Sequence, residues 1–218
     1  MYRLMIPLAI LTSALSLALQ EQDRPSVPLR DARMTIEWAP GVEAVLHISA
    51  ESEEELEDVR IQCPDGRTLV EFGTHASLGL ASLELEFPGP TLEELQARCV
   101  EGDYVIRAST VGGRMAVGSA RLSFDFPARP VLFHPRPSGI ATSSTTICWL
   151  RNHDAVSYEL QLEQGENDGL RVRLPPEQTV FRIPPGLLAR NTETNVEIAA
   201  IGANGNRTTT EVRFLTAP

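Results

Sequence analysis

The chain has 218 residues and a formal net charge of −10, with 22% charged and 42% hydrophobic residues, a composition typical of globular proteins. The charge is uneven, since residues 19–127 hold 20 Asp and Glu against 9 Arg, whereas residues 128–218 hold nine of each. An acidic surface repels nucleic-acid phosphates and releases no counterions from them. The composition therefore excludes nucleic acid as a partner and disfavours anionic lipid surfaces.

The first 18 residues have the pattern of a secretory signal peptide. Arg3 precedes an apolar stretch that runs to about Leu19, and small residues fit cleavage just after Ala18. An uncleaved membrane anchor is the alternative, but the stretch is short for a spanning helix and Pro7 interrupts it. We expect a secreted or periplasmic protein with no membrane insertion after the signal is cleaved.

Residues 19–32 are polar with two prolines, and they predict a flexible lead-in. From Arg33 apolar and polar residues alternate, which is the period of a half-buried β-strand. The run Cys63-Pro64-Asp65-Gly66-Arg67 predicts a hairpin turn, because Gly accepts positive φ. The alternating apolar positions are Met34, Ile36 and Trp38, then Ala44, Leu46 and Ile48, then Leu83, Leu85 and Phe87.

One helix is predicted, over Thr91–Val100. Thr91 and Glu94 have the spacing of a capping box. Leu92, Leu95 and Cys99 then form one apolar stripe at helical spacing. We expect this to be the only helix longer than two turns.

The segment Pro127–Pro130 has two prolines in four residues and is predicted to be a stiff domain boundary. Beyond it, six or seven short alternating strands without a helical pattern indicate a β-sandwich. The predicted fold class is all-β, with two tandem β-sandwich domains: an acidic, immunoglobulin-like domain at 33–127 that contains the helix, and a second domain at 130–218. The alternating positions of the second domain are Ile147, Trp149, Val156, Tyr158, Leu160, Leu162, Leu170, Val172, Leu174, Phe181, Ile183, Val196, Ile198, Ala200, Val212 and Phe214.

The second domain resembles a fibronectin type III domain. The resemblance implies that Trp149 lies in the core. Where that family usually has a tyrosine that braces a corner, this chain has Thr194, so Leu188 and Val196 are expected to stabilise the corner by packing. The matching segments are Pro130, Ile147-Cys148-Trp149, Tyr158-Glu159-Leu160, Ile183–Leu188, Glu197–Ile201 and Gly205-Asn206.

The whole mature chain also resembles a group of exported bacterial proteins of unknown function, which carry a strand-rich domain followed by a fibronectin-like one. The resemblance implies architecture and brings no catalytic residues. The segments that carry it are Pro64–Arg67, Leu92–Leu95, Glu101–Tyr104 and Pro127–Pro130.

The chain has three cysteines, and an oxidising compartment favours one disulfide with one leftover thiol. We predict a Cys63–Cys99 disulfide, since both fall in the first domain and Cys99 lies on the apolar face of the helix. Two independent small hydrophobic residues are the rival interpretation. Cys148 is then the remaining thiol, and it points away from the core if Trp149 points inward.

No catalytic, cofactor-binding or metal-binding residues are predicted. The run Glu51–Asp58 has six acids in eight residues; it is interpreted as a solvated loop or short helical turn, with a calcium-attracting patch as the alternative. Asn206-Arg207-Thr208 fits a glycosylation acceptor in an accessible turn, or simply a turn asparagine. The four histidines are scattered and carry no nucleophile motif: His47, His75, His134 and His153.

The leading hypothesis is a non-enzymatic binding or structural protein of the cell envelope or extracellular space, with a protein or envelope polymer as its partner. The alternative is a periplasmic ligand-binding or enzyme-accessory protein with a site between its two domains. An exposed apolar patch favours the first hypothesis, whereas a deep pocket with converging polar groups favours the second.

Overall fold

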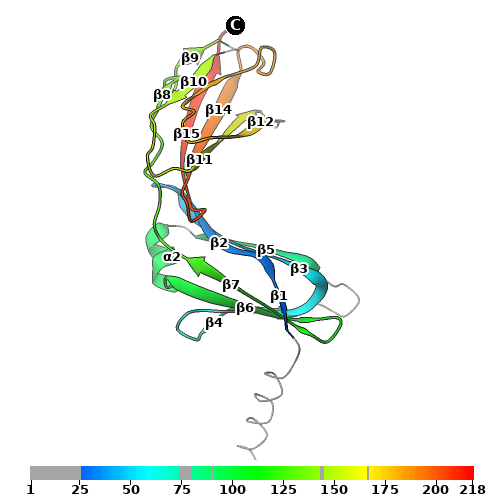
Figure 1. The fold of residues 1–218 in the computed structure, drawn as a ribbon. Helices are drawn as coiled ribbons and strands as arrows, with labels where there is room; N and C mark the ends of the chain where they lie inside the picture. Colours follow the sequence, from blue (N-terminus) through cyan, green and yellow to red (C-terminus); the bar gives the residue numbers. More distant parts are fainter. Residues whose placement is uncertain (1–25, 74–79, 90, 143–144, 166) are drawn as a thin grey trace, which may run out of the picture. The chain divides into compact units, whose positions relative to one another are not determined.

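A computed structural model describes residues 26–73, 80–89, 91–142, 145–165 and 167–218 (Figure 1). The predicted signal peptide at 1–18 and residues 19–25 of the predicted lead-in lie outside this range, while residues 26–28 and 30–32 of that lead-in are in β-strands. Within it, no helix is long and apolar enough to cross a membrane.

The described chain is built almost entirely from β-strands, which confirms the predicted all-β fold class with its single short helix. The first elements are β1 (Ser26–Pro28), β2 (Arg30–Ala39), β3 (Glu43–Gln62), β4 (Thr68–Gly73), β5 (Leu80–Gly89), α2 (Leu92–Arg98), β6 (Gly102–Thr110) and β7 (Met115–Leu122). The remaining elements are β8 (Leu132–His134), β9 (Ile140–Ala141), β10 (Thr146–Trp149), β11 (Ser157–Gln164), β12 (Asn167–Leu174), β13 (Val180–Arg182), β14 (Glu193–Ile201) and β15 (Arg207–Thr216).

The chain divides into two compact units. The first unit is Met1–Ala32, Ser49–Leu83 and Asp103–Ala120, and the second is Arg33–Ile48, Glu84–Gly102 and Arg121–Pro218. The domain bounds predicted at 33–127 and 130–218 stay a prediction. Each unit is described by itself below.

In the first unit, β1 pairs with β7 in parallel, and the second half of β3 pairs with β6 and β4 in antiparallel register. The predicted turn at Cys63–Arg67 joins β3 to β4. The Cys63 amide donates to the Arg67 carbonyl at 2.8 Å, and Gly66 has φ of +86°. Glycine is required there because other residues are strained at that φ.

The helix α2 in the second unit has seven residues, three fewer than predicted, so it is just under two turns long and the prediction of a helix longer than two turns was wrong. The hydroxyl of Thr91 accepts a hydrogen bond from the Glu94 amide at 3.1 Å, which is the N-cap predicted from the sequence. Cys99 leaves the helical conformation and forms the C-cap. Leu95 and Cys99 are buried, as the apolar stripe predicts.

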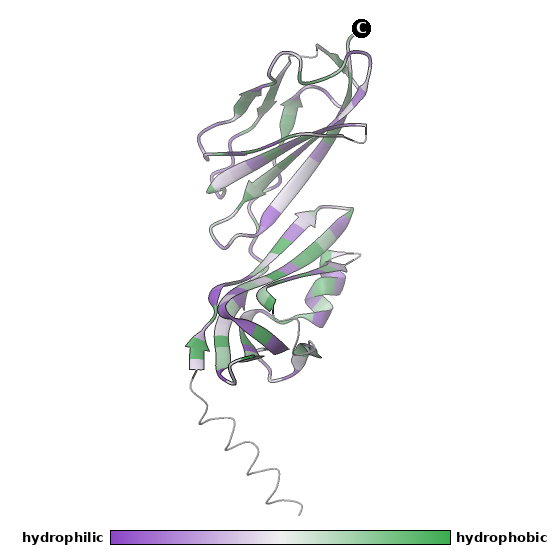
Figure 2. Ribbon diagram, turned by 90° about the vertical axis from the view of Figure 1, so that its right-hand side faces the viewer, coloured by the Kyte–Doolittle hydropathy of each residue, from purple (hydrophilic) through white to green (hydrophobic). Residues whose placement is uncertain are grey.

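The C-terminal part of the second unit is a two-sheet β-sandwich. One sheet has the order β13-β10-β8, and the facing strands have the order β15-β14-β11-β12. Apolar and polar residues alternate along these strands in Figure 2, as the sequence predicts. Trp149 and Tyr158 meet edge to face in the core, with ring centroids 5.5 Å apart. The core residues include Ile147, Trp149, Tyr158, Leu160, Leu162, Ile183, Leu188, Val196, Ile198, Ala200 and Phe214.

The corner that lacks the family tyrosine is stabilised by packing and by one glutamine. Leu188 and Val196 are buried in the core, as expected. In addition, the side-chain Nε2 of Gln164 donates to the Thr194 hydroxyl at 2.9 Å. The side-chain Oε1 of Gln164 accepts from the backbone amide of Ala189 at 2.7 Å. Hydrogen bonding from Gln164 therefore takes part in bracing a corner for which the sequence predicted packing alone.

The Pro127–Pro130 segment is hydrogen-bonded along its length. The Thr208 hydroxyl donates to the Pro127 carbonyl, and the Thr210 hydroxyl donates to the Pro130 carbonyl, both at 2.8 Å. The side-chain Nδ2 of Asn152 donates to the carbonyl of Ala128 at 2.5 Å. The segment is therefore held in place by side chains of the sandwich as well as stiffened by its prolines.

Candidate interaction surface

The outer surface of the β13-β10-β8 sheet is the strongest candidate for a functional site. Ile147 and Trp149 point into the core of the sandwich, so the alternation of β10 places Cys148 on the outer side. The register pairs Cys148 with Val180 on β13 and with His134 on β8. Directly paired residues lie on the same side of a sheet, which sets Val180 beside the thiol.

A one-residue irregularity in the β8–β10 pairing brings additional apolar side chains to the same side. The register shifts between Cys148 and Trp149, while Leu132 opposite Trp149 packs against the core. Val131 and Phe133, the neighbours of Leu132, therefore point outward. We call the outer residues Val131, Phe133, Cys148, Leu150 and Val180 the open face.

The apolar residues of the open face are strongly exposed. The exposed fractions of Val131, Phe133, Leu150 and Val180 lie between 50% and 56%. Single exposed hydrophobic residues are ordinary, but several on one sheet surface are typical of a protein contact. Cys148 lies among them and is half-buried, and this burial raises the pKa of its thiol.

The segments that build this sheet are positively charged. Residues 131–151 and 176–190 together contain four Arg and one Glu, whereas residues 152–175 and 191–218 contain four Arg and eight acids. The four Arg residues are all exposed, and none forms an ion pair with a carboxylate in the described part of the chain. They are Arg136, Arg151, Arg182 and Arg190.

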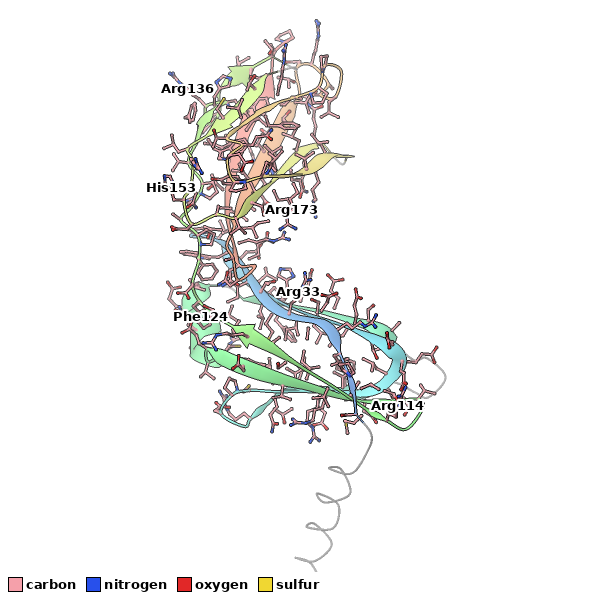
Figure 3. All side chains as sticks on the ribbon, in the orientation of Figure 1. Arg33, Arg114, Phe124, Arg136, His153 and Arg173 are labelled. Atoms are coloured by element: carbon pink, nitrogen blue, oxygen red, sulfur yellow. The ribbon has the colours of Figure 1, made fainter. Side chains whose placement is uncertain are left out.

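Two of the arginines can be placed relative to the open face. Arg182 pairs with Thr146 across β13 and β10, two residues from Cys148, so it lies on the same outer side. Figure 3 shows Arg136 at the β8 side of the unit and Arg173 at the β12 side. The strand register therefore places one of these arginines, Arg182, beside the apolar residues of the open face.

A shallow groove in the second unit is the other candidate site. Its volume is about 220 Å³, and its lining includes Glu37, Arg129, Glu197 and Glu211. Ligand pockets usually enclose about 300–1,000 Å³ and are mostly apolar. The groove is thus smaller and more acidic than a typical small-molecule site.

Burial, followed by the neighbouring carboxylates Glu37, Glu163 and Glu211, raises the pKa of Glu197 to about 7. Arg171 opposes the shift. The groove therefore holds a carboxyl group that is half protonated near neutral pH. Arg129 at its edge donates to the Thr210 hydroxyl at 3.0 Å, which fixes its guanidinium.

The acidic run Glu51–Asp58 lies in strand β3, so its interpretation as a loop or helical turn was wrong. The reason is that its alternate residues can be solvated on one side of a strand while Leu56 is buried. Glu53 forms an ion pair with Arg30, and Glu54 forms one with Arg114. Among the described residues, no group of three or more His, Cys, Asp or Glu is placed to hold a metal ion.

Asn206 is not the accessible turn residue that a glycosylation site requires. Its exposed fraction is 1%. The Oδ1 atom accepts from the Ile36 amide at 2.8 Å, and Nδ2 donates to the carbonyls of Ser123 and Asp125 at 2.7 and 2.9 Å. The sequence did not indicate that Asn206 bridges these three backbone groups, because all three lie more than 80 residues away along the chain.

The described histidines occupy separate sites. His134 contacts the Thr145 hydroxyl through Nε2 at 3.0 Å, and His47 lies 3.4 Å from the Glu86 carboxylate. His153 is exposed (Figure 3), and His75 lies outside the described residues. His134 and His47 thus each have a side-chain partner of their own in the structure.

The three cysteines are thiols in the structure. Cys63 is buried in the first unit and Cys99 is buried in the second. The Cys63–Cys99 disulfide of the oxidised protein stays a prediction. The outward position of Cys148 agrees with the alternation of its strand.

Comparisons with known proteins assign no family. No protein-family model matches the chain, and no curated protein matches it. Among solved structures, the fibronectin(III)-like modules of Clostridium thermocellum CbhA align with 87% of this chain and 93% of theirs, at 10% identity and a TM-score of 0.36. A two-domain fibronectin type III segment of chicken tenascin aligns with 88% of this chain and 98% of its own, at 13% identity and a TM-score of 0.32.

A third similar structure is the FN1–FN3 segment of chicken CNTN1. It aligns with 88% of this chain and 68% of its own length, at 11% identity and a TM-score of 0.34. The β-sandwich assignment made above rests on the strand pairing of the chain itself.

Proposed function

We propose that this chain is an exported, non-enzymatic binding module that docks a protein partner through the open face. The observation that carries the proposal is the cluster of exposed apolar side chains on one sheet surface, around the Cys148–Val180 pair. An exposed apolar surface beside charged side chains fits a protein better than a small molecule. The secreted or periplasmic location rests on the N-terminal sequence pattern.

The ligand-binding alternative has weaker support. The groove beside Glu197 encloses only about 220 Å³, which is less than the usual volume for a bound cofactor or metabolite. Its carboxylates also repel one another, so an anionic ligand is disfavoured there. A docking surface is therefore the better explanation for the exposed features of this chain.

Site-specific photo-crosslinking tests the proposal. A benzophenone amino acid replaces Phe133 on the open face, and a matched variant carries it at Ile140, which is 71% exposed on β9. Irradiation of cells that produce the protein is expected to give discrete adducts at position 133 and none at position 140. Absence of adducts at position 133, or equal adducts at both positions, contradicts the proposal.

A further inference from the structure

The charge of the open face narrows the choice of partner. Arg182 lies on this face, Arg151 follows directly after Leu150, and both are exposed. Two copies joined by the same face would set these arginines against each other, and like charges facing each other are unfavourable. An acidic surface with its own apolar contact is the complementary partner.

The chain itself carries such a surface on its first unit. Glu51, Glu53 and Glu55 are exposed at alternate positions of β3, so their side chains lie along one side of the strand. We call these three residues the acidic stripe. Glu53 forms an ion pair with Arg30. The ion pairs among the described residues do not include Glu51 or Glu55.

An exposed apolar residue lies beside the acidic stripe. The amide of Val111 donates to the carbonyl of Glu55 at 2.9 Å, and the Val111 side chain is 46% exposed. The stripe thus combines carboxylates with an apolar contact, as the open face combines arginine with apolar residues.

The two surfaces share the repeat that every β-strand has, which permits the contact without selecting it. Successive outward residues on a strand are about 6.7 Å apart. This spacing separates the carboxylates of the stripe, and it also separates the Thr146–Arg182 pair from the Cys148–Val180 pair on the open face.

We infer that the open face of one copy receives the acidic stripe and Val111 of a second copy, in a head-to-tail contact. The inference rests on the proposed function, since it names the partner of the same surface. Each copy offers one open face and one stripe, so the contact is heterologous and chains of copies can grow. The attraction between exposed charges is expected to weaken as salt increases.

Sedimentation velocity of the full mature chain tests the inference, with protein from 5 to 500 µM in 20 mM and 500 mM NaCl. We expect larger species as the concentration rises at low salt, and at least tenfold weaker association at high salt. Arg182→Glu alone, and the double change Glu51→Arg with Glu55→Arg, should each weaken self-association at least tenfold.

Mixing the two variants gives the decisive result. The Arg182→Glu copy keeps a native stripe, and the stripe variant keeps a native open face, so one intact contact can form between them. A one-to-one dimer and nothing larger is expected. The controls are Arg213→Glu on β15 for the single reversal, and Glu84→Arg on β5 with Glu193→Arg on β14 for the double reversal. Both controls should leave association unchanged.

Two outcomes overturn the inference. One is a chain that stays monomeric at every concentration. The other is association that the stripe variant leaves intact, or that mixing does not restore. If the Phe133 crosslink then traps a different protein, the proposed function stands and only the self-contact is lost; if it traps nothing, both fail.

Discussion

Glu197 on β14 lies directly opposite Glu211 on β15 in the antiparallel ladder. Like charges at directly opposed positions destabilise a sheet. Glu37 adds a third carboxylate beside the same groove. Protonation of Glu197 relieves this repulsion, which makes the stability of the second unit depend on pH.

We expect the free energy of unfolding to fall as pH rises from about 4.5 to about 7. The folded state raises the pKa of Glu197 from 4.5 to about 7, so the folded chain binds the proton more tightly than the unfolded chain. The resulting stability is present in full below pH 4.5 and is lost as pH rises through 7. After allowance for solvent screening, the loss should be roughly 1–2 kcal/mol. Urea unfolding between pH 4 and 8 measures it.

Glu197→Gln should remove this pH dependence and make the protein more stable at pH 8. The control is Glu193→Gln, which neutralises an exposed carboxylate on the same strand. If the stability of Glu197→Gln depends on pH as that of the wild type does, another group causes the dependence and the prediction is wrong.

Asn206→Ala should lower the stability of the second unit by about 2–4 kcal/mol. Removing the amide leaves the Ile36 amide and the Ser123 and Asp125 carbonyls without this partner, and each buried unsatisfied polar group costs about 1–3 kcal/mol. Thermal and urea unfolding measure the change. Asn204→Ala in the same turn removes two hydrogen bonds of an exposed side chain, to the Asp125 carbonyl and from the Asn206 amide. It should cost clearly less because water can replace an exposed partner, and equal losses in both variants would refute the role of Asn206.

The alternation of apolar residues predicted the strands. The resemblance to a fibronectin type III domain implied the core position of Trp149, and the outward position of Cys148 followed from it by alternation. The hairpin at Cys63–Arg67 and the N-cap at Thr91 were predictable because both depend on residues a few positions apart. These features are local, so their physical causes lie within a short stretch of sequence.

The open face and the role of Asn206 were not predictable in the same way. The open face depends on the register that pairs Cys148 with Val180 and His134 and leaves Phe133 in the irregularity of the β8–β10 pairing, and register is set by strands far apart in the chain. The acidic run was misread because charge favours solvent exposure, which the outer side of a paired strand provides as well as a loop.

The predicted Cys63–Cys99 disulfide should appear in protein purified from an oxidising compartment. Intact-mass analysis with thiol alkylation is expected to find one alkylated cysteine without reductant and three with it. The bond should add about 3–4 kcal/mol in the chain-entropy model, so Cys63→Ser should lower the melting temperature. Three alkylated cysteines without reductant would support the rival interpretation of two buried small residues.

Cys148 should react slowly with alkylating reagents in the folded protein. Burial raises the pKa of its thiol, which lowers the fraction of reactive thiolate at neutral pH. The rate with iodoacetamide should therefore be lower than in the unfolded chain and should rise steeply as pH increases. A folded rate equal to the unfolded rate would place Cys148 in a more open setting than its half-buried position indicates.

Hydroxyl-radical footprinting tests the central claim most directly, since it reports the exposure of individual side chains. The oxidation rates of Phe133, Leu150 and Ile140 are compared between the purified chain at 1 µM and the protein in its native surroundings, that is, on or in the cells that produce it. A docked open face predicts that Phe133 and Leu150 oxidise several-fold more slowly in the native surroundings, while Ile140 oxidises at the same rate in both. Equal rates for Phe133 in the two settings would contradict the assignment of the open face as a docking surface.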